Sequence, residues 1–140
     1  MNTNLPLPKH KFINKALYFP NQGILVVGDL HLGYEIMLKT KGVQLPFNQL
    51  ETTKKEIEII INQIKKKKKP LNKIILLGDI KHLFSFFKAE FFEIKNFLKF
   101  LEKFVSKKNI ILIKGNHDKT LSKKEKAKYK DYYIESNIAF

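Results

Sequence analysis

The sequence has 140 residues, enough for one domain with its own core, and it contains no cysteine. It therefore excludes disulfides and thiolate metal sites and is compatible with a cytoplasmic location. Its 27 basic residues are all lysine and give a formal net charge of +14, which favours polyanionic partners such as nucleic acid, although a solvated lysine face needs no partner. No apolar stretch approaches ~20 residues and the N-terminus has no apolar signal, so we expect neither a membrane span nor secretion.

The first elements are predicted to be short strands. Residues 1–15 form a polar leader without a period, and "KALYFP" (15–20) is typical of an edge strand that stops at a proline. "ILVVG" (24–28) is a continuous apolar run, as expected for a strand that is covered on both faces. Residues 36–49 are expected to form a loop, because Gly42 and Pro46 oppose regular structure.

Two helices and two further strands are predicted after this loop. Isoleucines recur at helical spacing in the first helix, and a threonine pair before Glu56 marks its start: Thr52, Thr53, Ile57, Ile60, Ile61 and Ile64. The lysine run 65–69 suits the negative end of this helix, and a contact with nucleic acid is the second interpretation. "KIILLGD" (73–79) and "NIILIKGNHD" (109–118) repeat the strand pattern.

A second amphipathic helix lies between these two strands. Its apolar stripe consists of Phe84, Phe87, Phe91, Ile94, Leu98, Leu101 and Val105. "YYIE" (132–135) is predicted to be a last strand. The order strand–helix–strand–helix–strand predicts an α/β fold with mainly parallel central strands in a single domain, 1–140.

Polar side chains follow the three central strands, each within three residues after a glycine. These residues are Asp29 and His31, then Asp79, then Asn116, His117 and Asp118. The carboxyl ends of parallel strands meet at one edge of a sheet, where α/β folds bind their ligands. Carboxylate and imidazole groups suit divalent ions such as manganese, iron or zinc. The sequence therefore predicts a metal site at this edge, with Asp79 able to bridge two ions.

The motifs "GDLH", "GDIKH" and "GNHD", in this order, resemble those of the calcineurin-like metallophosphoesterases. "VVGDLHLGYE" with "LLGDIKH" is similar to a branch related to the nuclease subunit SbcD, and the resemblance covers residues 23–118. It implies part of an α/β/β/α sandwich and a metal-dependent hydrolase that acts on phosphate esters, with nucleic acid or nucleotide diesters as candidate substrates. It also implies two divalent ions, with Mn²⁺ expected first and iron or zinc as alternatives.

The resemblance implies a role for each matching residue. Asp29 and His31 would bind the first ion, Asp79 would bridge both ions, and Asn116 would bind the second. His117 would lie beside the phosphate as a catalytic residue, and Asp118 would accept a hydrogen bond from His117 and orient it. His82 matches the "GDxKH" form of the branch, and we expect it to line the substrate pocket rather than to bind metal.

The sequence departs from the family pattern after "GNHD". No histidine follows His117, whereas the family pattern continues with another metal-binding histidine and a "GHxH" element. We therefore expect an incomplete domain that exposes apolar strand surface and lacks a C-terminal half or a partner chain. Two alternatives remain open: the chain is an inactive fragment, or it is a basic protein that only binds polyanions.

Overall fold

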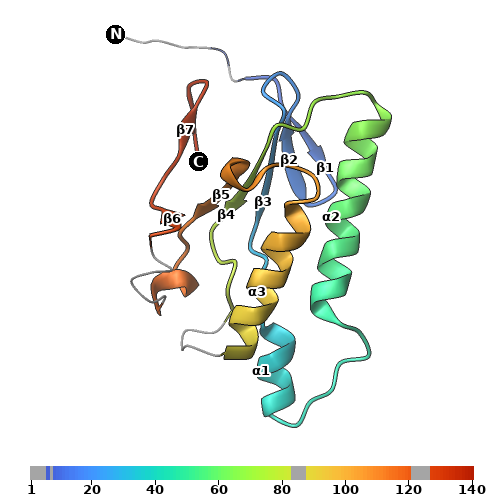
Figure 1. Cartoon of the computed structure of the whole chain (residues 1–140), viewed down its shortest axis with the longest axis vertical. Helices are drawn as coiled ribbons and strands as arrows, with labels where there is room; N and C mark the ends of the chain where they lie inside the picture. Colours follow the sequence, from blue (N-terminus) through green and yellow to red (C-terminus); the bar gives the residue numbers. More distant parts are fainter. Residues whose placement is uncertain (1–5, 7, 83–87, 121–126) are drawn as a thin grey trace.

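The computed structural model describes residues 6, 8–82, 88–120 and 127–140, and its centre is a six-stranded sheet (Figure 1). The strands, in spatial order, are β1 (Lys11–Ile13), β2 (Ala16–Phe19), β3 (Ile24–Gly28), β4 (Lys73–Leu77), β5 (Ile110–Ile113) and β6 (Tyr129–Lys130). β1, β2 and β3 are antiparallel, whereas β3, β4, β5 and β6 run parallel. This arrangement confirms the predicted α/β class with mainly parallel central strands.

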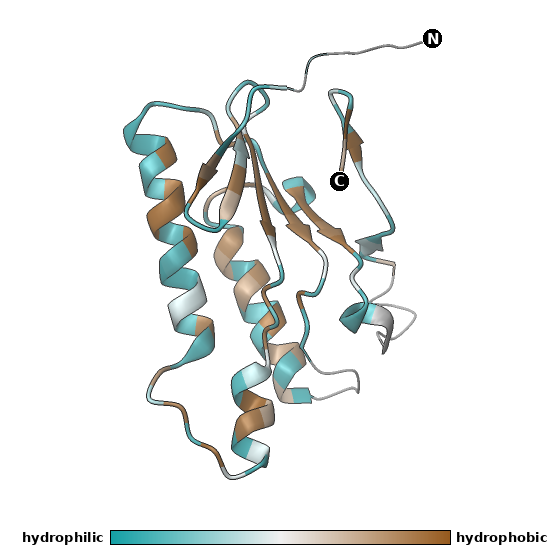
Figure 2. Ribbon diagram, turned by 180° about the vertical axis from the view of Figure 1, so that it is seen from behind, coloured by the Kyte–Doolittle hydropathy of each residue, from teal (hydrophilic) through white to brown (hydrophobic). Residues whose placement is uncertain are grey.

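The two long helices cover one face of this sheet (Figures 1 and 2). They are α2 (Gln49–Lys66) and α3 (Lys88–Leu101). The apolar stripes of α2 and α3 are buried against alternate residues of β3 and β4, including Leu25, Val27 and Leu76. None of the described helices is long and apolar enough to cross a bilayer.

The helix ends differ slightly from the sequence prediction. The side chain of Asn48 caps α2 by accepting a hydrogen bond from the backbone N–H of Glu51 at 3.0 Å, so the helix begins before the predicted threonine pair. Val105 is buried but lies after the end of α3. Phe84 and Phe87 of the predicted stripe lie outside the described residues.

The opposite face of the sheet is also covered. Six of its apolar side chains are at most 8% exposed: Phe19, Ile24, Val26, Ile75, Ile111 and Ile113. Tyr133, Ile138 and Phe140 from the C-terminal segment pack against them. Leu77, two residues after Ile75 on β4 and therefore on the same face, is 41% exposed, so the expected exposure of apolar strand surface is found only in part.

The C-terminal segment forms a hairpin of β7 (Ile134–Glu135) and β8 (Ile138–Ala139) that pairs only with itself in the described structure. The predicted last strand, 132–135, thus does not extend the central sheet.

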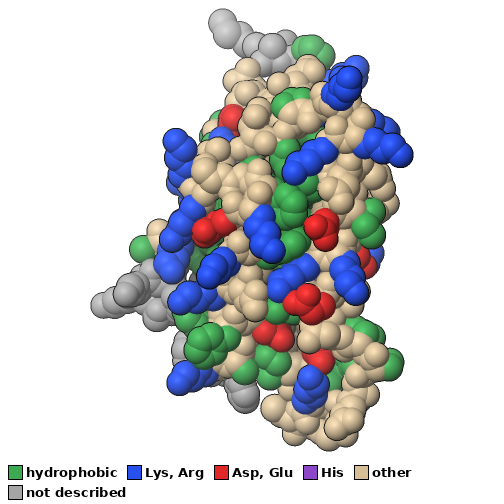
Figure 3. Space-filling view, turned by 45° about the vertical axis from the view of Figure 1, so that its right-hand side comes forward, with side chains coloured by type: hydrophobic (Ala, Val, Ile, Leu, Met, Phe, Trp, Pro, Cys, Tyr) green, Lys and Arg blue, Asp and Glu red, His purple; other side chains and the backbone are tan. Residues whose placement is uncertain are grey.

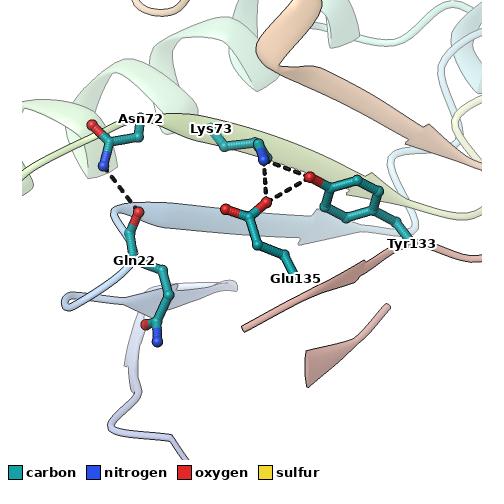
Figure 4. Close-up of polar contacts among 5 residues, drawn as sticks. All are labelled: Gln22, Asn72, Lys73, Tyr133 and Glu135. Atoms are coloured by element: carbon teal, nitrogen blue, oxygen red, sulfur yellow. Dashed lines mark hydrogen bonds and ion pairs between the residues drawn. The ribbon is translucent and has the colours of Figure 1, made fainter. Parts of the chain in front are cut away.

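Figure 4 shows how Lys73 at the start of β4 contacts both Tyr133 and Glu135. Hydrogen bonds from Lys73 and Tyr133 hold the pKa of Glu135 below its ordinary value. Nearby, Asn72 donates to the backbone carbonyl of Gln22 at 3.0 Å.

Two further elements differ from the prediction. β1 lies in the segment predicted to be an irregular leader, so β1 and not β2 forms the edge of the sheet. α1 (Tyr34–Thr40) replaces the first part of the predicted loop. Short 3₁₀ turns, η1 (Lys107–Asn109) and η2 (His117–Thr120), flank β5.

Candidate metal centre

The polar motifs all follow the carboxyl ends of β3, β4 and β5. Three of these residues have left-handed backbone conformations, with φ of 51° at Asp29, 45° at His31 and 43° at Asp79. Such conformations are unfavourable for residues other than glycine and persist only where the surroundings hold them. The backbone at this edge is therefore shaped to present these particular side chains.

Backbone hydrogen bonds join the loop after β3 to the loop after β4. The N–H of His31 donates to the carbonyl of Asp79 at 2.9 Å, and the N–H of His82 donates to the carbonyl of Leu32 at 3.0 Å. Leu32 and Lys81 form an isolated parallel bridge between these bonds. The pairing of β3 with β4 thus continues into the loops and fixes the spacing of the two motifs.

Two carboxylates and one imidazole gather at this edge. Asp29, His31 and Asp79 each offer a ligand atom, and these atoms lie within 4.8 Å of one another. We call this set the acidic group. Asp79 also accepts a hydrogen bond from the backbone N–H of His117 at 2.9 Å, which links the acidic group to the loop after β5.

The close approach of Asp79 leaves no room for a side chain at position 115, which explains the glycine there. A Cβ atom on Gly115 would lie 2.2 Å from both the backbone nitrogen and Oδ1 of Asp79. Atoms cannot approach so closely, and one of them belongs to the backbone. The glycine of "GNHD" therefore makes room for the aspartate of "GDIKH".

Three histidines form a second cluster that shares His31 with the acidic group. The ligand atoms of His31, His82 and His117 lie within 4.8 Å of one another, and we call this set the imidazole group. Burial, followed by the neighbouring His31 and His117, lowers the pKa of His82 from its ordinary value. Tyr34 packs edge-on against the His82 ring at 4.9 Å between centroids.

Sequence reasoning did not anticipate the position of His82 in this cluster. His82 was predicted to line a substrate pocket and not to bind metal. In the structure, the ligand atoms of His82, His31 and His117 lie close enough together to bind one ion. The "KH" that follows "GDI" was the available signal, but no local pattern showed which way the ring would face.

Asp118 has partners other than those the family resemblance implies. Its carboxylate is fully buried and accepts hydrogen bonds from the backbone N–H groups of Gly115 at 2.9 Å and Lys81 at 3.3 Å. The Nδ1 atom of His117 instead contacts the carbonyl oxygen of His82 at 2.5 Å. In the structure Asp118 ties two loops together and the His82 carbonyl contacts His117, while the predicted orienting role of Asp118 stays a prediction.

A buried ion pair, absent from the sequence prediction, supports the loop after β4. Lys81 and Glu90 approach to 3.2 Å, with side chains 5% and 1% exposed. Glu90, from α3, also accepts a hydrogen bond from the backbone N–H of His82 at 2.9 Å. The α3 helix thereby holds the backbone that carries His82.

The loop after β3 is supported by Glu35 and Gln49. The Gln49 side chain donates to the His31 carbonyl at 3.0 Å, and the Gln49 backbone N–H donates to buried Glu35 at 2.8 Å. A hydrogen bond from Lys39, followed by that of Gln49, lowers the pKa of Glu35. Asn116 lies between Gly115 and His117 with an exposed side chain.

The donor set suits a divalent cation. The acidic group offers carboxylate oxygens and an imidazole, which manganese, iron and zinc all accept. The Nδ1 atom of His31 is buried and has no hydrogen-bond partner among the described residues. A buried ring nitrogen without a partner is costly, and a bound cation would satisfy it. The residues present therefore fit a metal ion.

Comparisons with known proteins place the chain in a family. The family model described as calcineurin-like phosphoesterase matches residues 23–140. A solved structure, the nuclease MPE of Pseudomonas putida, has the same fold, with a TM-score of 0.50 and 20% sequence identity; the match covers 83% of this chain and 50% of that one. No curated protein matches the chain. The chain has part of the metallophosphoesterase fold, and it belongs to the calcineurin-like phosphoesterase family.

Proposed function

We propose that this chain hydrolyses phosphate esters, including nucleic-acid or nucleotide diesters, through two divalent ions at the edge of its sheet. The convergence of Asp29, His31 and Asp79 within 4.8 Å carries the proposal. Membership of the calcineurin-like phosphoesterase family supports the reaction class. The chain spans half the length of the nuclease whose fold it shares, so the activity of the whole class is proposed here for a shorter chain.

The acidic group would hold the first ion. Asp79 carries two carboxylate oxygens and can bridge to a second ion, to which Asn116 would add an amide oxygen. Manganese is the first ion to test, because it accepts carboxylate, amide and imidazole ligands together. When bound, a pair of such ions polarises the phosphoryl oxygen and lowers the pKa of bound water.

His117 would supply a proton to the leaving oxygen. Hydrolysis places a water oxygen on phosphorus, breaks the P–O ester bond and releases one water proton to solvent, while the leaving oxygen gains a proton. The His82 carbonyl contacts Nδ1 of His117, so a cationic His117 would donate from Nε2. The hydrogen bond from the His117 backbone to Asp79 keeps this ring beside the acidic group.

The assay uses bis-p-nitrophenyl phosphate with Mn²⁺ and compares the parent chain with Asp79→Ala. Loss of the bridging carboxylate should lower kcat/KM by at least about a hundredfold, the scale of one lost electrostatic contact in an active site. Asp131→Asn is the matched control, because Asp131 is an exposed carboxylate that pairs with Lys114 at 2.7 Å. Equal rates for the parent and Asp79→Ala would refute the proposal, and p-nitrophenyl phosphate would test preference for monoesters.

A binding role for the basic surface is the second candidate. Figure 3 shows lysines across the face formed by α2 and α3. A groove there is lined by Glu51, Lys54, Lys55, Glu58, Asn96, Lys99, Phe100 and Lys103. Lys54 is engaged with Glu51 at 2.7 Å, so acidic side chains offset part of this charge. Binding of a single-stranded oligonucleotide that weakens steeply with salt would support this role, and affinity independent of salt would exclude it.

A further inference from the structure

Three of the four histidines of the chain converge on one point, from the loop after β3, the loop after β4 and the start of η2. We infer that His31, His82 and His117 form a second cation site, which prefers zinc-like ions and competes with the acidic group for His31. It shares His31 with the proposed catalytic centre and to that extent rests on the proposed function. Zinc binding itself is measured without any substrate.

The geometry of the three rings brings their nitrogens together. Ring centroids are 5.0 Å apart for His31 and His117, 5.6 Å for His31 and His82, and 5.7 Å for His82 and His117. A tetrahedral zinc ion with Zn–N bonds of about 2.1 Å holds its ligand atoms about 3.4 Å apart. The ligand atoms here lie within 4.8 Å of one another, so rotations of the rings would close the remaining gap.

Unsatisfied nitrogens point to a ligand at this cluster. Nδ1 of His31 and Nδ1 of His82 are both buried, and neither has a hydrogen-bond partner in the part of the chain that is described. Two such atoms in adjacent rings are unusual, because buried ring nitrogens are normally paired. A cation that bound one nitrogen of each ring would fix both tautomers and offset the cost of burial.

The His117 ring is oriented in the way that metal-binding histidines usually are. Its Nδ1 contacts the carbonyl oxygen of His82, and a proton on Nδ1 puts the lone pair on Nε2. The chain thus provides both a ligand and the group that orients it. Glu90 fixes the same loop by accepting the N–H of His82 at 2.9 Å.

The two groups differ in the ions they favour. Three neutral imidazoles suit Zn²⁺, Cu²⁺ or Ni²⁺, whereas the carboxylates of the acidic group suit harder ions such as Mn²⁺ or Mg²⁺. Both groups need His31, so an ion in one disfavours an ion in the other. Zinc in the imidazole group would also occupy His117, and it should therefore inhibit manganese-dependent hydrolysis.

The test titrates the metal-free full chain with Zn²⁺ alone, by calorimetry, and with Co²⁺, by its visible absorption. We expect one tight zinc site and the intense absorption of tetrahedral cobalt. His82→Gln should weaken zinc binding by at least about 100-fold, since even groups that only orient a ligand contribute 10–100-fold. His10→Gln is the control, because His10 is the exposed histidine outside the cluster, and it should bind zinc like the parent. Equal zinc affinity in the His82→Gln and His10→Gln variants would overturn the inference.

Two further variants keep the result decisive. His82→Cys retains a zinc ligand, so it should bind zinc and add a thiolate-to-cobalt charge-transfer band even if His82→Gln fails to fold. Asp29→Asn should lose manganese binding yet keep zinc affinity within about threefold, because Asp29 lies outside the imidazole group. Loss of zinc binding in folded Asp29→Asn would place zinc in the acidic group and overturn the inference. Absence of hydrolysis with zinc binding intact would reject only the proposed function.

Discussion

The two ends of the parallel strands use polar residues in different ways. At the carboxyl ends, Asp79 and Asp118 accept hydrogen bonds from the backbone of neighbouring loops, and Lys81 forms a buried ion pair with α3. At the amino ends, the lysine run 65–69 closes α2 and is exposed to solvent. Both regions are rich in charge, but the residues at the carboxyl ends have a fixed geometry, whereas the lysine run is exposed. Charge density alone therefore does not locate the site.

The largest expected effect comes from breaking the buried ion pair. Lys81→Met leaves the carboxylate of Glu90 buried beside an apolar side chain, and it should lower the free energy of unfolding by about 3–5 kcal/mol. Urea unfolding measures this change. Lys114→Met removes an exposed pair with Asp131 and should cost at most about 1 kcal/mol. Equal losses of stability in the two variants would show that the buried ion pair contributes no more than the exposed one.

A smaller effect is expected from filling the space beside Asp79. In Gly115→Ala the new Cβ overlaps the backbone of Asp79, so we expect a loss of about 1–3 kcal/mol in stability and weaker manganese binding. Gly42→Asn is the control, because Gly42 has a φ of 78° with open space around it and asparagine tolerates that conformation. Wild-type manganese affinity in folded Gly115→Ala would contradict the tight fit that we describe.

Acid should weaken the support of the loop after β3. The folded pKa of Glu35 lies below its ordinary value of 4.5, chiefly through the Lys39 hydrogen bond. Glu35 therefore contributes stability above about pH 4.5, and this contribution is lost as the pH falls through the lowered folded pKa. Urea unfolding of Glu35→Gln should show a flatter loss of stability below pH 4.5 than the parent. The control is Glu56→Gln, an exposed carboxylate 3.9 Å from Lys15, which should follow the parent curve.

The smallest effect is expected at the amino ends of the strands. Replacing Lys67, Lys68 and Lys69 together by glutamine should change stability by no more than about 0.5 kcal/mol, because these side chains are exposed. Figure 1 shows that α2 ends at the opposite end of the sheet from the loops after β3 and β4, which carry the acidic group. Manganese-dependent hydrolysis of an oligonucleotide should therefore stay unchanged. A large drop in its rate would assign these lysines to the substrate path.

Elements with a strong local signal could be predicted from the sequence. β3 and β4 are uninterrupted apolar runs, and α2 has isoleucines at helical spacing, so propensity and pattern agree with the final packing. α1 had no such signal. It is seven residues long, and its N-cap residue Gly33 has a φ of 98° and provides no side-chain cap. β1 is short and begins with a lysine, so it resembles a polar leader.

The candidate site could be predicted only in part, because strand ends follow from topology but side-chain partners do not. The convergence of Asp29, His31 and Asp79 follows once β3 and β4 are parallel neighbours. The contact of Lys81 with Glu90 depends on how α3 packs against the loop after β4, and the contacts of Asp118 depend on how two loops pack together. No spacing in the sequence encodes that packing.

The most direct measurement is a crystal structure of the full chain grown with Mn²⁺ and recorded with anomalous scattering at the manganese edge. The account predicts an anomalous peak from a manganese ion that is bound by Asp29, His31 and Asp79. Manganese bound elsewhere, or an ordered acidic group with no manganese at saturating concentration, would contradict the proposed catalytic centre.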